Sequence, residues 1–318
     1  SIAPAKPALE LRPAPGVPRG LAWVAVVLVF LLMVIGNVVS ATGSGLACPD
    51  WPLCHGRLIP PLEPDIMVEW SHRLVAALSS IVLLVTIGLV LRRSAARGLR
   101  RLGVVLLVLL GVQILLGGVT VLLKLPDLIS TAHLVNGLLI FAGLVVLAAA
   151  TAPTAPRPGP EAARLRHLIA AGLAALLVQL ALGGYVRHAG AGLACPDFPL
   201  CGGDLVPSHG LGWAHWVHRW LGVALLGLFL HLAMTARRAG GAIAGAARLA
   251  AALAVVQVTL GILAVLLRLT PPIRAAHAAA GYALWGVLVW LSARAGLWTS
   301  LLAVPRPAPD PLPEALRA

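Results

Sequence analysis

The sequence predicts an all-α membrane protein whose eight transmembrane helices form two tandem four-helix bundles, related as parallel repeats. Three observations lead to this fold class. The 318 residues are 59% hydrophobic and only 11% charged, whereas a soluble domain carries roughly 25% charged residues. Apolar stretches of roughly 20 residues recur along the chain, and each is long enough to cross a bilayer. Several motifs of the first half also return in the second half in the same order.

The apolar stretches define the elements in chain order. The expected spans are residues 21–41, 68–91, 102–123, 128–150, 165–187, 212–235, 244–267 and 273–296. The first stretch is too long for the hydrophobic core of a signal peptide and lacks a convincing cleavage site, so no cleavable signal is expected. The Pro-rich ends, 1–19 and 305–313, are expected to be disordered tails. The predicted organisation is a tail (1–20), a four-helix half (21–150), a linker (151–164), a second four-helix half (165–297) and a tail (298–318).

The net charge of +13 is a topology signal rather than a sign of nucleic-acid binding. When Lys and Arg are assigned to alternating sides of the eight spans, most fall on one side, which is cytoplasmic by the positive-inside rule. The poor side carries only Arg57, Lys124, Arg187, Arg268 and Arg274, with Arg73 and Arg219 just inside the spans there. Both termini are therefore expected in the cytoplasm of a bacterial-type inner membrane, with the cysteine-containing loops on the outer side.

Four motifs carry the internal repeat. The pairs are "GSGLACPDWPLC" (43–54) with "GAGLACPDFPLC" (190–201), "EWSHRL" (69–74) with "HWVHRW" (215–220), "VQILLGGVTVLLKLP" (112–126) with "VQVTLGILAVLLRLT" (256–270), and "STAHLVNG" (130–137) with "RAAHAAAG" (274–281). Equivalent positions are four spans apart, so the halves share one orientation and are related by an axis along the membrane normal. The natural architecture is a pair of four-helix bundles.

Four of the ten histidines occupy equivalent positions in the two halves: His72, His133, His218 and His277. Each lies in the first turns of an even-numbered span entered from the outer side, so the two histidines of one half share a depth. Two opposed imidazoles at one depth suit a six-coordinate haem iron, and bundles build cofactor sites from facing helices. The pattern therefore predicts one haem between His72 and His133 and another between His218 and His277.

Other interpretations of these residues remain open. A single membrane histidine more often hydrogen-bonds a neighbouring helix, but four at repeat-related positions favour ligation, because intramembrane ionisable residues default to function. A closed zinc site would normally recruit more side chains, often thiolates, and copper is likewise disfavoured. Arg73 and Arg219, each next to a histidine, are candidates to pair with haem propionates or to snorkel towards the interface.

Glu69 is the acid that the predicted spans place inside the membrane, and His215 stands at its position in the second half. A buried carboxylate is costly unless it is paired or protonated. One interpretation is a structural pair with Arg73, one helical turn away. The other is a catalytic role, because perturbed acids beside a cofactor are often functional. The difference between the halves suggests that one performs chemistry and the other holds a permanent haem.

The four cysteines form two repeat-related pairs, Cys48 with Cys54 and Cys195 with Cys201, in loops assigned to the oxidising outer side. Disulfides are therefore expected, and the spacing is not a usual zinc spacing. For Cys195 and Cys201 the interpretation is a structural bridge. For Cys48 and Cys54, a structural bridge and a redox-active pair stand level.

Eight spans in two halves, the cysteine pairs, and "EWSHR", "TAHLVNG", "HWVHR" and "AAHAAAG" together resemble the haem A synthase family, from about residue 21 to 297. The resemblance implies oxidation of the C8 methyl of haem O to a formyl group, giving haem A for terminal oxidases. It implies that His72 and His133 hold the substrate haem, His218 and His277 hold haem b, and Glu69 acts at the catalytic centre. Cys48 and Cys54 match a cysteine pair considered functional in part of the family.

The reaction expected from this resemblance is a stepwise two-electron oxidation through hydroxymethyl and gem-diol stages, followed by loss of water. Glu69 would accept a proton or orient a water. The expected partners are the lipid bilayer, haem O, the haem O synthase that supplies it, and an electron donor or acceptor that the sequence does not identify. The oligomeric state stays open. The rival functions are a bis-haem electron-transfer cytochrome and a haem carrier or assembly protein.

Overall fold

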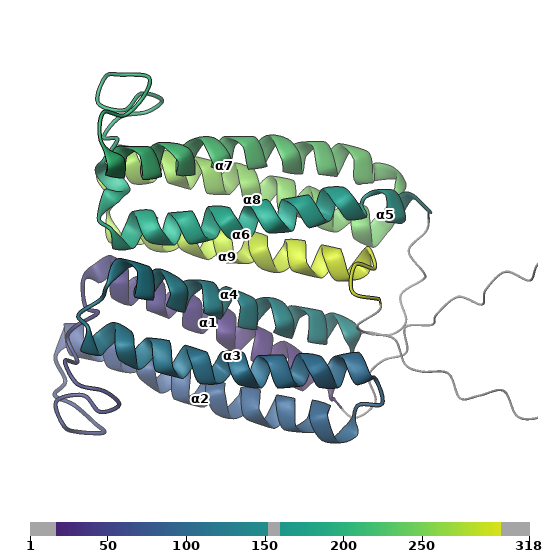
Figure 1. The fold of residues 1–318 in the computed structure, drawn as a ribbon, viewed down its shortest axis with the longest axis horizontal. Helices are drawn as coiled ribbons and strands as arrows, with labels where there is room; N and C mark the ends of the chain where they lie inside the picture. The colour runs from purple at the N-terminus through teal and green to yellow at the C-terminus, as the bar shows by residue number, and fades with distance from the viewer. Residues whose placement is uncertain (1–16, 152–159, 300–318) are drawn as a thin grey trace, which may run out of the picture.

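The computed structural model describes residues 17–151 and 160–299, and within these ranges the chain is helical apart from turns, loops and two isolated β-bridges. The helices are α1 (Arg19–Thr42), α2 (Pro64–Arg93), α3 (Arg97–Leu122), α4 (Asp127–Ala150), α5 (Pro160–Arg164), α6 (Arg166–His188), α7 (Gly210–Thr235), α8 (Gly241–Leu266) and α9 (Pro271–Arg294), with short 3-10 turns η1 (Ala191–Leu193) and η2 (Ala236–Arg238) (Figure 1). Eight of them are long and apolar enough to cross a membrane. The predicted all-α membrane fold is confirmed.

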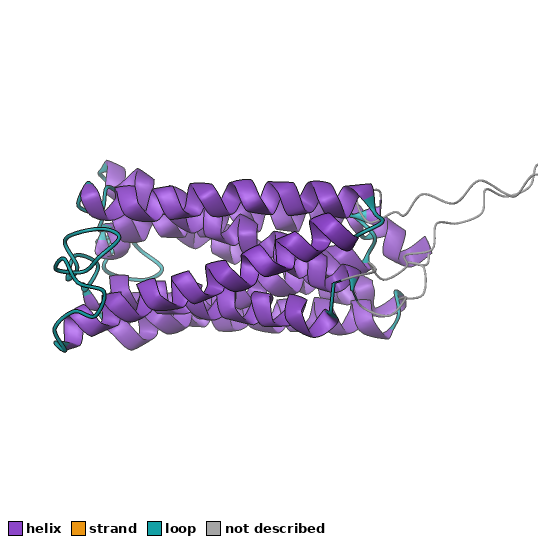
Figure 2. Cartoon of the chain, turned by 90° about the horizontal axis from the view of Figure 1, so that it is seen from below, coloured by secondary structure: helices purple, strands orange, loops and turns teal. Residues whose placement is uncertain are grey.

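The helices pack as two neighbouring groups, α1–α4 and α6–α9 (Figure 1). In each group the helices contact one another in chain order, and the first also contacts the last. The groups meet through contacts of α1 with α9 and of α4 with both α6 and α9. Seen at 90° to the first view, the long helices run side by side with the loops gathered at their two ends (Figure 2).

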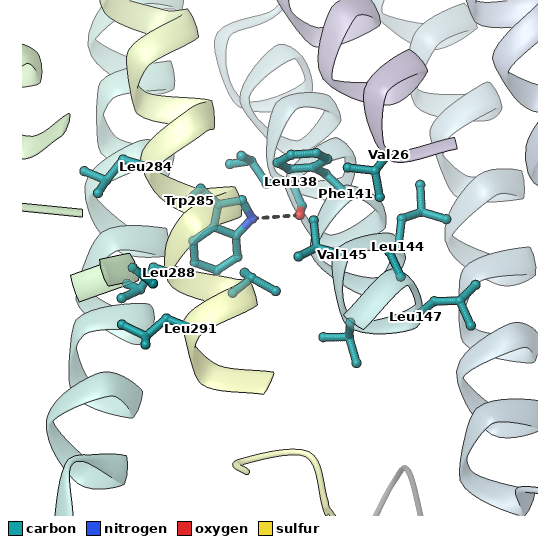
Figure 3. Packing of buried hydrophobic residues seen from close by; sticks show 14 of the residues in the cluster. Val26, Leu138, Phe141, Leu144, Val145, Leu147, Leu284, Trp285, Leu288 and Leu291 are labelled. Carbon is teal, nitrogen blue, oxygen red and sulfur yellow. Dashed lines mark hydrogen bonds between the residues drawn. The ribbon is translucent and has the colours of Figure 1, made fainter. Parts of the chain in front are cut away.

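The central core lies where the groups meet. In α4, 56% of the most apolar window is buried, and in α9 44%, against 17% in α3. Figure 3 shows Phe141 of α4 and Trp285 of α9 within this cluster, where the Trp285 indole N–H donates to the carbonyl of Leu138 at 3.0 Å. A Cβ on Gly286 would lie 3.0 Å from the Phe141 ring, so the small residue permits this close packing. Helices that contact only their own group leave apolar side chains exposed, as expected for surfaces that face lipid.

Several helices begin before the predicted spans, because their first turns tolerate polar residues. The helix expected at 68–91 begins at Pro64, with Pro in the first turn and Asp65 beside it. Proline suits the first helical position, and a carboxylate there is favoured by the helix dipole. Asp127 is placed in the same way at the start of α4. These acids join Glu69 inside helices, although only Glu69 lies beyond the first turn.

Residues 1–16, 152–159 and 300–318 lie outside the described ranges, and they make up most of the predicted tails (1–20 and 298–318) and most of the predicted linker. The described end of that linker is the short helix α5. At the opposite end of the molecule, α1 is joined to α2 by a loop (43–63) and α6 to α7 by a loop (189–209) (Figure 1). We call these the first and second disulfide loops, and that end the disulfide end.

Candidate haem sites and their supporting loops

The four repeat-related histidines lie at similar depth. Helices α2, α4, α7 and α9 all begin at the disulfide end (Figure 1). His72 and His218 fall in the third turn of α2 and α7, and His133 and His277 in the second turn of α4 and α9. At about 1.5 Å rise per residue, all four lie roughly 9 to 12 Å from the start of their helices.

The second half brings its two histidines into opposition. The ring centres of His218 and His277 are 6.4 Å apart, with ring planes inclined at 80°. An imidazole nitrogen binds a transition metal at about 2 Å, so two ring centres that flank one metal ion lie roughly 6 Å apart. Both side chains line a cavity of about 400 Å³, within the usual range for cofactor sites. The arrangement fits a haem with two axial histidines.

A glycine on the preceding helix lies against each of the four imidazoles. A Cβ added to Gly36 or Gly183 would come within 2.8 and 2.7 Å of Cε1 of His72 and His218, respectively. The same addition at Gly117 or Gly261 would come within 3.2 and 3.1 Å of Cε1 of His133 and His277. Real Cβ atoms essentially never come closer than 3.0 Å, so Gly36 and Gly183 are required for the present ring positions, while a Cβ at Gly117 or Gly261 would make an unusually tight contact. The cradle occurs four times, once for each predicted ligand.

The ring nitrogens of the four imidazoles are not all occupied by hydrogen bonds to the protein. In the described part of the chain, Nδ1 of all four rings is buried without a hydrogen-bond partner of normal geometry. Nε2 of His133 and of His277 lies 3.4 Å from the side-chain nitrogen of Gln113 and Gln257, a long contact. Buried polar atoms without partners point to a missing ligand.

Protein side chains alone do not complete a metal cage in the described residues, where no group of three or more His, Cys, Asp or Glu gathers. Two imidazoles per half would leave the remaining positions on a metal ion to another donor. A porphyrin supplies four nitrogens in one plane and leaves two axial positions. The donor set therefore fits haem better than a closed zinc or copper site.

Glu69 is buried, with 3% of its surface exposed, and both carboxylate oxygens are bonded. Oε2 accepts the backbone N–H of Cys48 at 2.7 Å, and Oε1 accepts from Arg73 at 2.5 Å. The ion pair joins successive turns of α2, as the structural interpretation predicts. Glu69 thus anchors the first disulfide loop to α2, and this role does not exclude chemistry at its carboxylate.

His215 occupies the same place in the second half. The backbone N–H of Cys195 points at Nδ1 of His215 from 3.3 Å, and Nε of Arg219 points at Nε2 from 3.1 Å. A neutral imidazole has a single acceptor nitrogen, whereas a carboxylate has two acceptor oxygens. The two surrounding donors therefore suit a carboxylate, which can accept from both. In the second half, neutral His215 can accept from only one of them, Cys195 or Arg219.

Arg73 and Arg219 are bonded mainly to the disulfide loops. Arg73 donates to the carbonyls of Cys48, Asp50 and Leu53 in addition to Glu69. Arg219 donates to the carbonyls of Cys195, Asp197 and Leu200 in addition to His215. Four donor contacts from a group with five N–H bonds leave little capacity for the propionates that the sequence suggested as partners.

Both predicted disulfides are present, Cys48 with Cys54 and Cys195 with Cys201. Within each loop an aspartate accepts two backbone N–H groups at 2.7 to 2.8 Å: Asp50 from His55 and Gly56, and Asp197 from Gly202 and Gly203. Those bonds, led by Gly56 and by Gly202, lower the pKa of Asp50 and of Asp197 below the ordinary value. The two loops are thus built by the same contacts.

The sequence patterns did not single out three further groups of site residues: the four glycines against the imidazoles, the two glutamines near His133 and His277, and the arginines Arg187 and Arg274. Gln113, Gly117, Gln257 and Gly261 do fall inside the repeated motif at 112–126 and 256–270, so the repeat carried a signal for them. Arg187 and Arg274 line the cavity of His218 and His277. They carried no repeat signal, because the first half has no arginine at the matching positions.

A sequence profile of the COX15-CtaA family, described as Cytochrome oxidase assembly protein, matches residues 19–67 and 63–289. The chain belongs to this family. Among curated relatives, a Heme A synthase of Rhodospirillum centenum is 30% identical over 343 residues, covering 89% of this chain and 91% of that protein. Heme A synthases of Symbiobacterium thermophilum and Bacillus pumilus are 36% and 30% identical over 225 and 223 residues, each covering 66% of this chain and 72% of the relative. The family match spans both candidate haem sites.

Proposed function

We propose that this chain is a haem A synthase, an oxidoreductase that converts the C8 methyl of haem O to a formyl group through successive hydroxylations. The observation that carries the proposal is the pair of imidazole sites inside a chain of this family. One site has the ring separation that an axially ligated haem requires, and its four-residue plan of two histidines and two cradle glycines recurs in the other half.

The two sites receive different roles in the proposal. The first half, with Glu69 beside its site, holds haem O as substrate between His72 and His133. The second half, with His215 at the matching position, holds haem b between His218 and His277. Haem b supplies redox chemistry when bound. The protein orients the reacting methyl group and excludes water around it.

Glu69 is the proposed acid–base residue of the first half. Both of its oxygens already accept hydrogen bonds, from Cys48 and Arg73. Glu69 can take a proton or hold a water near the substrate methyl only if one of its carboxylate oxygens first gives up the hydrogen bond from Cys48 or from Arg73. Because Cys48 is bonded to Cys54, opening of that disulfide would loosen the loop N–H that now occupies Oε2. This contact links the redox state of the first pair to the freedom of Glu69.

The proposed setting is the inner membrane of a bacterium, with both termini in the cytoplasm and the disulfide end facing outwards. Support comes from the distribution of Lys and Arg along the chain and from the two disulfides, which persist in oxidising compartments. Haem O is hydrophobic and reaches the first half from the bilayer, handed on by the synthase that makes it. The electron partner would dock at the disulfide end, where all four histidines lie.

The proposal is tested by expressing the chain in a host that makes haem O but no haem A. Wild type should yield haem A in the extracted pigments. Glu69→Gln and Glu69→His should lose about a hundredfold or more in haem A formation, the low end expected for an acid–base residue. Glu69→His is the more informative variant, because histidine already occupies the equivalent position, 215, in the second half and is accommodated by the same fold. The matched control is Glu63→Gln, an exposed acid immediately before α2.

Full haem A formation by either Glu69 variant would remove Glu69 from the chemistry. The absence of haem A from wild type, with two haem B groups per chain, would favour the electron-transfer cytochrome instead. That rival is weakened by the placement of all four histidines at one end of their helices, since a transmembrane electron path would need haems near both faces.

A further inference from the structure

Three arginines line the second-half cavity, and one of them, Arg219, is bonded to the carbonyls of the second disulfide loop. Arg187, near the end of α6, and Arg274, near the start of α9, are both half-buried and both line the cavity of His218 and His277. Within residues 17–151 and 160–299, the ion pairs are Arg73 with Glu69 and Arg164 with Glu161. Neither involves Arg187 or Arg274, so these two arginines of the cavity form no ion pair with a carboxylate of the described residues.

These arginines donate hydrogen bonds to neutral oxygens of α1, and Arg187 also lies within hydrogen-bonding reach of the Tyr282 hydroxyl on α9. Arg187 donates from Nε to Oγ of Ser40 at 2.8 Å and, more weakly, to the carbonyl of Asn37 at 3.4 Å. Arg274 donates to the carbonyls of Ala41 and Ser40 at 3.1 and 3.4 Å. Neutral oxygens do not balance a desolvated charge, which is stable only when paired. Each guanidinium also has N–H groups left for a stronger acceptor.

The position of the arginines relative to the histidines is regular. Arg274 precedes His277 by three residues on α9, and Arg187 follows Gly183, the cradle of His218, by four residues on α6. Residues three or four apart lie on one face of a helix about one turn from each other. The helices α6 and α9 run in opposite directions, so both arginines lie about one turn nearer the disulfide end than the imidazoles. The cations therefore flank the same edge of the cavity.

The first half lacks this feature. When Gly36 is aligned with Gly183, Ser40 stands where Arg187 does, and when His133 is aligned with His277, Ser130 stands where Arg274 does. The repeat otherwise preserves the histidines, their cradle glycines and the loop-binding arginines Arg73 and Arg219. The two cations are thus specific to the second-half site.

We propose that Arg187 and Arg274 form a clamp for the two carboxylates of the second-half ligand, which are the haem propionates. The proposal rests on the proposed function, since it takes the second-half ligand to be haem b. Planar guanidinium groups bind carboxylates through paired, charge-assisted hydrogen bonds. The clamp also ties the ligand to α1, because both arginines bond α1 as well. A clamp in the second half and serines in the first half would let one haem stay while the other exchanges.

The test compares haem B with its dimethyl ester, in which both carboxylates are blocked. The full chain carries His133→Ala to disable the first site, is produced without haem, and is titrated in detergent with each pigment while the Soret band of the bis-histidine complex is followed. We expect haem B to bind at least about tenfold more tightly than the ester, the effect of one charge-assisted hydrogen bond or more. In Arg187→Gln/Arg274→Gln the two pigments should bind equally.

The controls separate the clamp from the proposed function and from a purely structural role. Arg268→Gln, an exposed arginine in the turn between α8 and α9, should keep the preference for haem B. Equal binding of haem B and its ester by the chain with intact arginines would overturn the clamp, and this comparison needs no arginine variant to fold. If His277→Ala left haem B binding unchanged, the second-half haem site itself would be wrong, and the proposed function with it.

Discussion

At the scale of single residues, the two halves differ most clearly at one pair of positions, Glu69 and His215. The same two donors, a loop N–H and an arginine, surround each side chain. A carboxylate satisfies both donors and neutralises the arginine, whereas an imidazole accepts from one. The second half lacks this buried ion pair but has the same loop contacts, which indicates that the carboxylate is not needed to build this fold.

Replacing His215 by glutamate should stabilise the protein, because the new carboxylate can accept from both Cys195 and Arg219. A hydrogen bond to a charged group contributes about 1.5 to 3 kcal/mol, and burial of the acid offsets part of it, so a net gain of about 1 kcal/mol is expected. The measurement is thermal unfolding of His215→Glu in detergent beside wild type. A lower unfolding temperature would show that the pocket is not matched to a carboxylate.

The cradle glycines should be sensitive to a single methyl group. In Gly183→Ala the new Cβ would lie 2.7 Å from Cε1 of His218, so the ring must shift from its present position opposite His277. Overpacking of this kind typically costs about 1 to 3 kcal/mol. We expect the second-half haem to lose its low-spin bis-histidine spectrum in optical and electron paramagnetic resonance measurements. Gly227→Ala on α7, where a Cβ meets nothing within 4 Å, should leave the spectrum unchanged. If Gly183→Ala gave the same spectrum as Gly227→Ala, Gly183 would not be needed to position the His218 ring.

The repeat in the sequence correctly predicted the two disulfides and the similar depth of the four histidines, whereas the role of the histidines as haem ligands stays a prediction. It could not predict the hydrogen bonds of Arg73 and Arg219, because the loop carbonyls they bind are positioned by the folded disulfide loops. It also missed Arg187 and Arg274, since their meaning depends on α6 and α9 meeting around one cavity. The opposition of the His218 and His277 rings could be seen only once α7 and α9 were packed in the bundle.

At the scale of elements, each disulfide loop is hydrogen-bonded to the helix that carries a proposed haem ligand. In the first loop the fastening consists of Glu69 and Arg73 of α2, and the indole N–H of Trp70 donates to the carbonyl of Leu58 at 2.8 Å. In the second loop the indole of Trp216 on α7 donates to Leu205 at 3.0 Å. Because the same helices carry His72 and His218, the loops and the imidazoles are held by one rigid element in each half.

Acid should loosen these loops. The backbone N–H bonds to Asp50 and Asp197 lower the pKa of each carboxyl group in the folded protein. A lowered folded pKa means that the stabilising contribution is complete above the unfolded value of about 3.9 and is lost as the pH falls through the folded value. Amide hydrogen exchange at Gly56 and Gly202, corrected for intrinsic rates, should therefore show constant protection from pH 7 to about 5 and a loss of protection below about 4.

Asp50→Asn is the matched control for the loop titration. It should abolish the acid-dependent step at Gly56 while leaving the step at Gly202 in place, since Asp197 is unchanged. Protection at Gly56 that falls with acid to the same extent in wild type and in Asp50→Asn would assign the effect to another group.

At the scale of the whole molecule, the two neighbouring groups of helices share one hydrophobic core. The core between them is built by α4 and α9, with Phe141 only 3% exposed and tilted against Phe30 of α1 at 6.1 Å. The same interface carries the bonds of Arg187 and Arg274 to α1. An apolar run in a sequence gives no indication of which face meets lipid and which meets protein, so this interface could not be derived from the eight spans.

Phe141→Ala should weaken this interface. Removal of a buried phenylalanine ring typically costs about 3 to 5 kcal/mol, because the cavity left behind is only partly filled. The loss is expected in unfolding by sodium dodecyl sulfate, followed by tryptophan fluorescence. Val108→Ala on α3, at a side chain that is 59% exposed, should change stability little. Equal effects of the two substitutions would show that the halves are not joined through this core.

The two halves are proposed to hold two different haems, a substrate in the first and haem b in the second. The most direct test of this central claim is extraction of pigments from the purified protein, with chromatography and mass spectrometry, for wild type, His133→Ala and His277→Ala. Wild type should contain haem B together with haem O, its hydroxylated form or haem A. His133→Ala should lose the farnesylated haem and keep haem B, and His277→Ala should lose haem B. Two haem B groups per wild-type chain from a host that makes haem O would contradict the assignment.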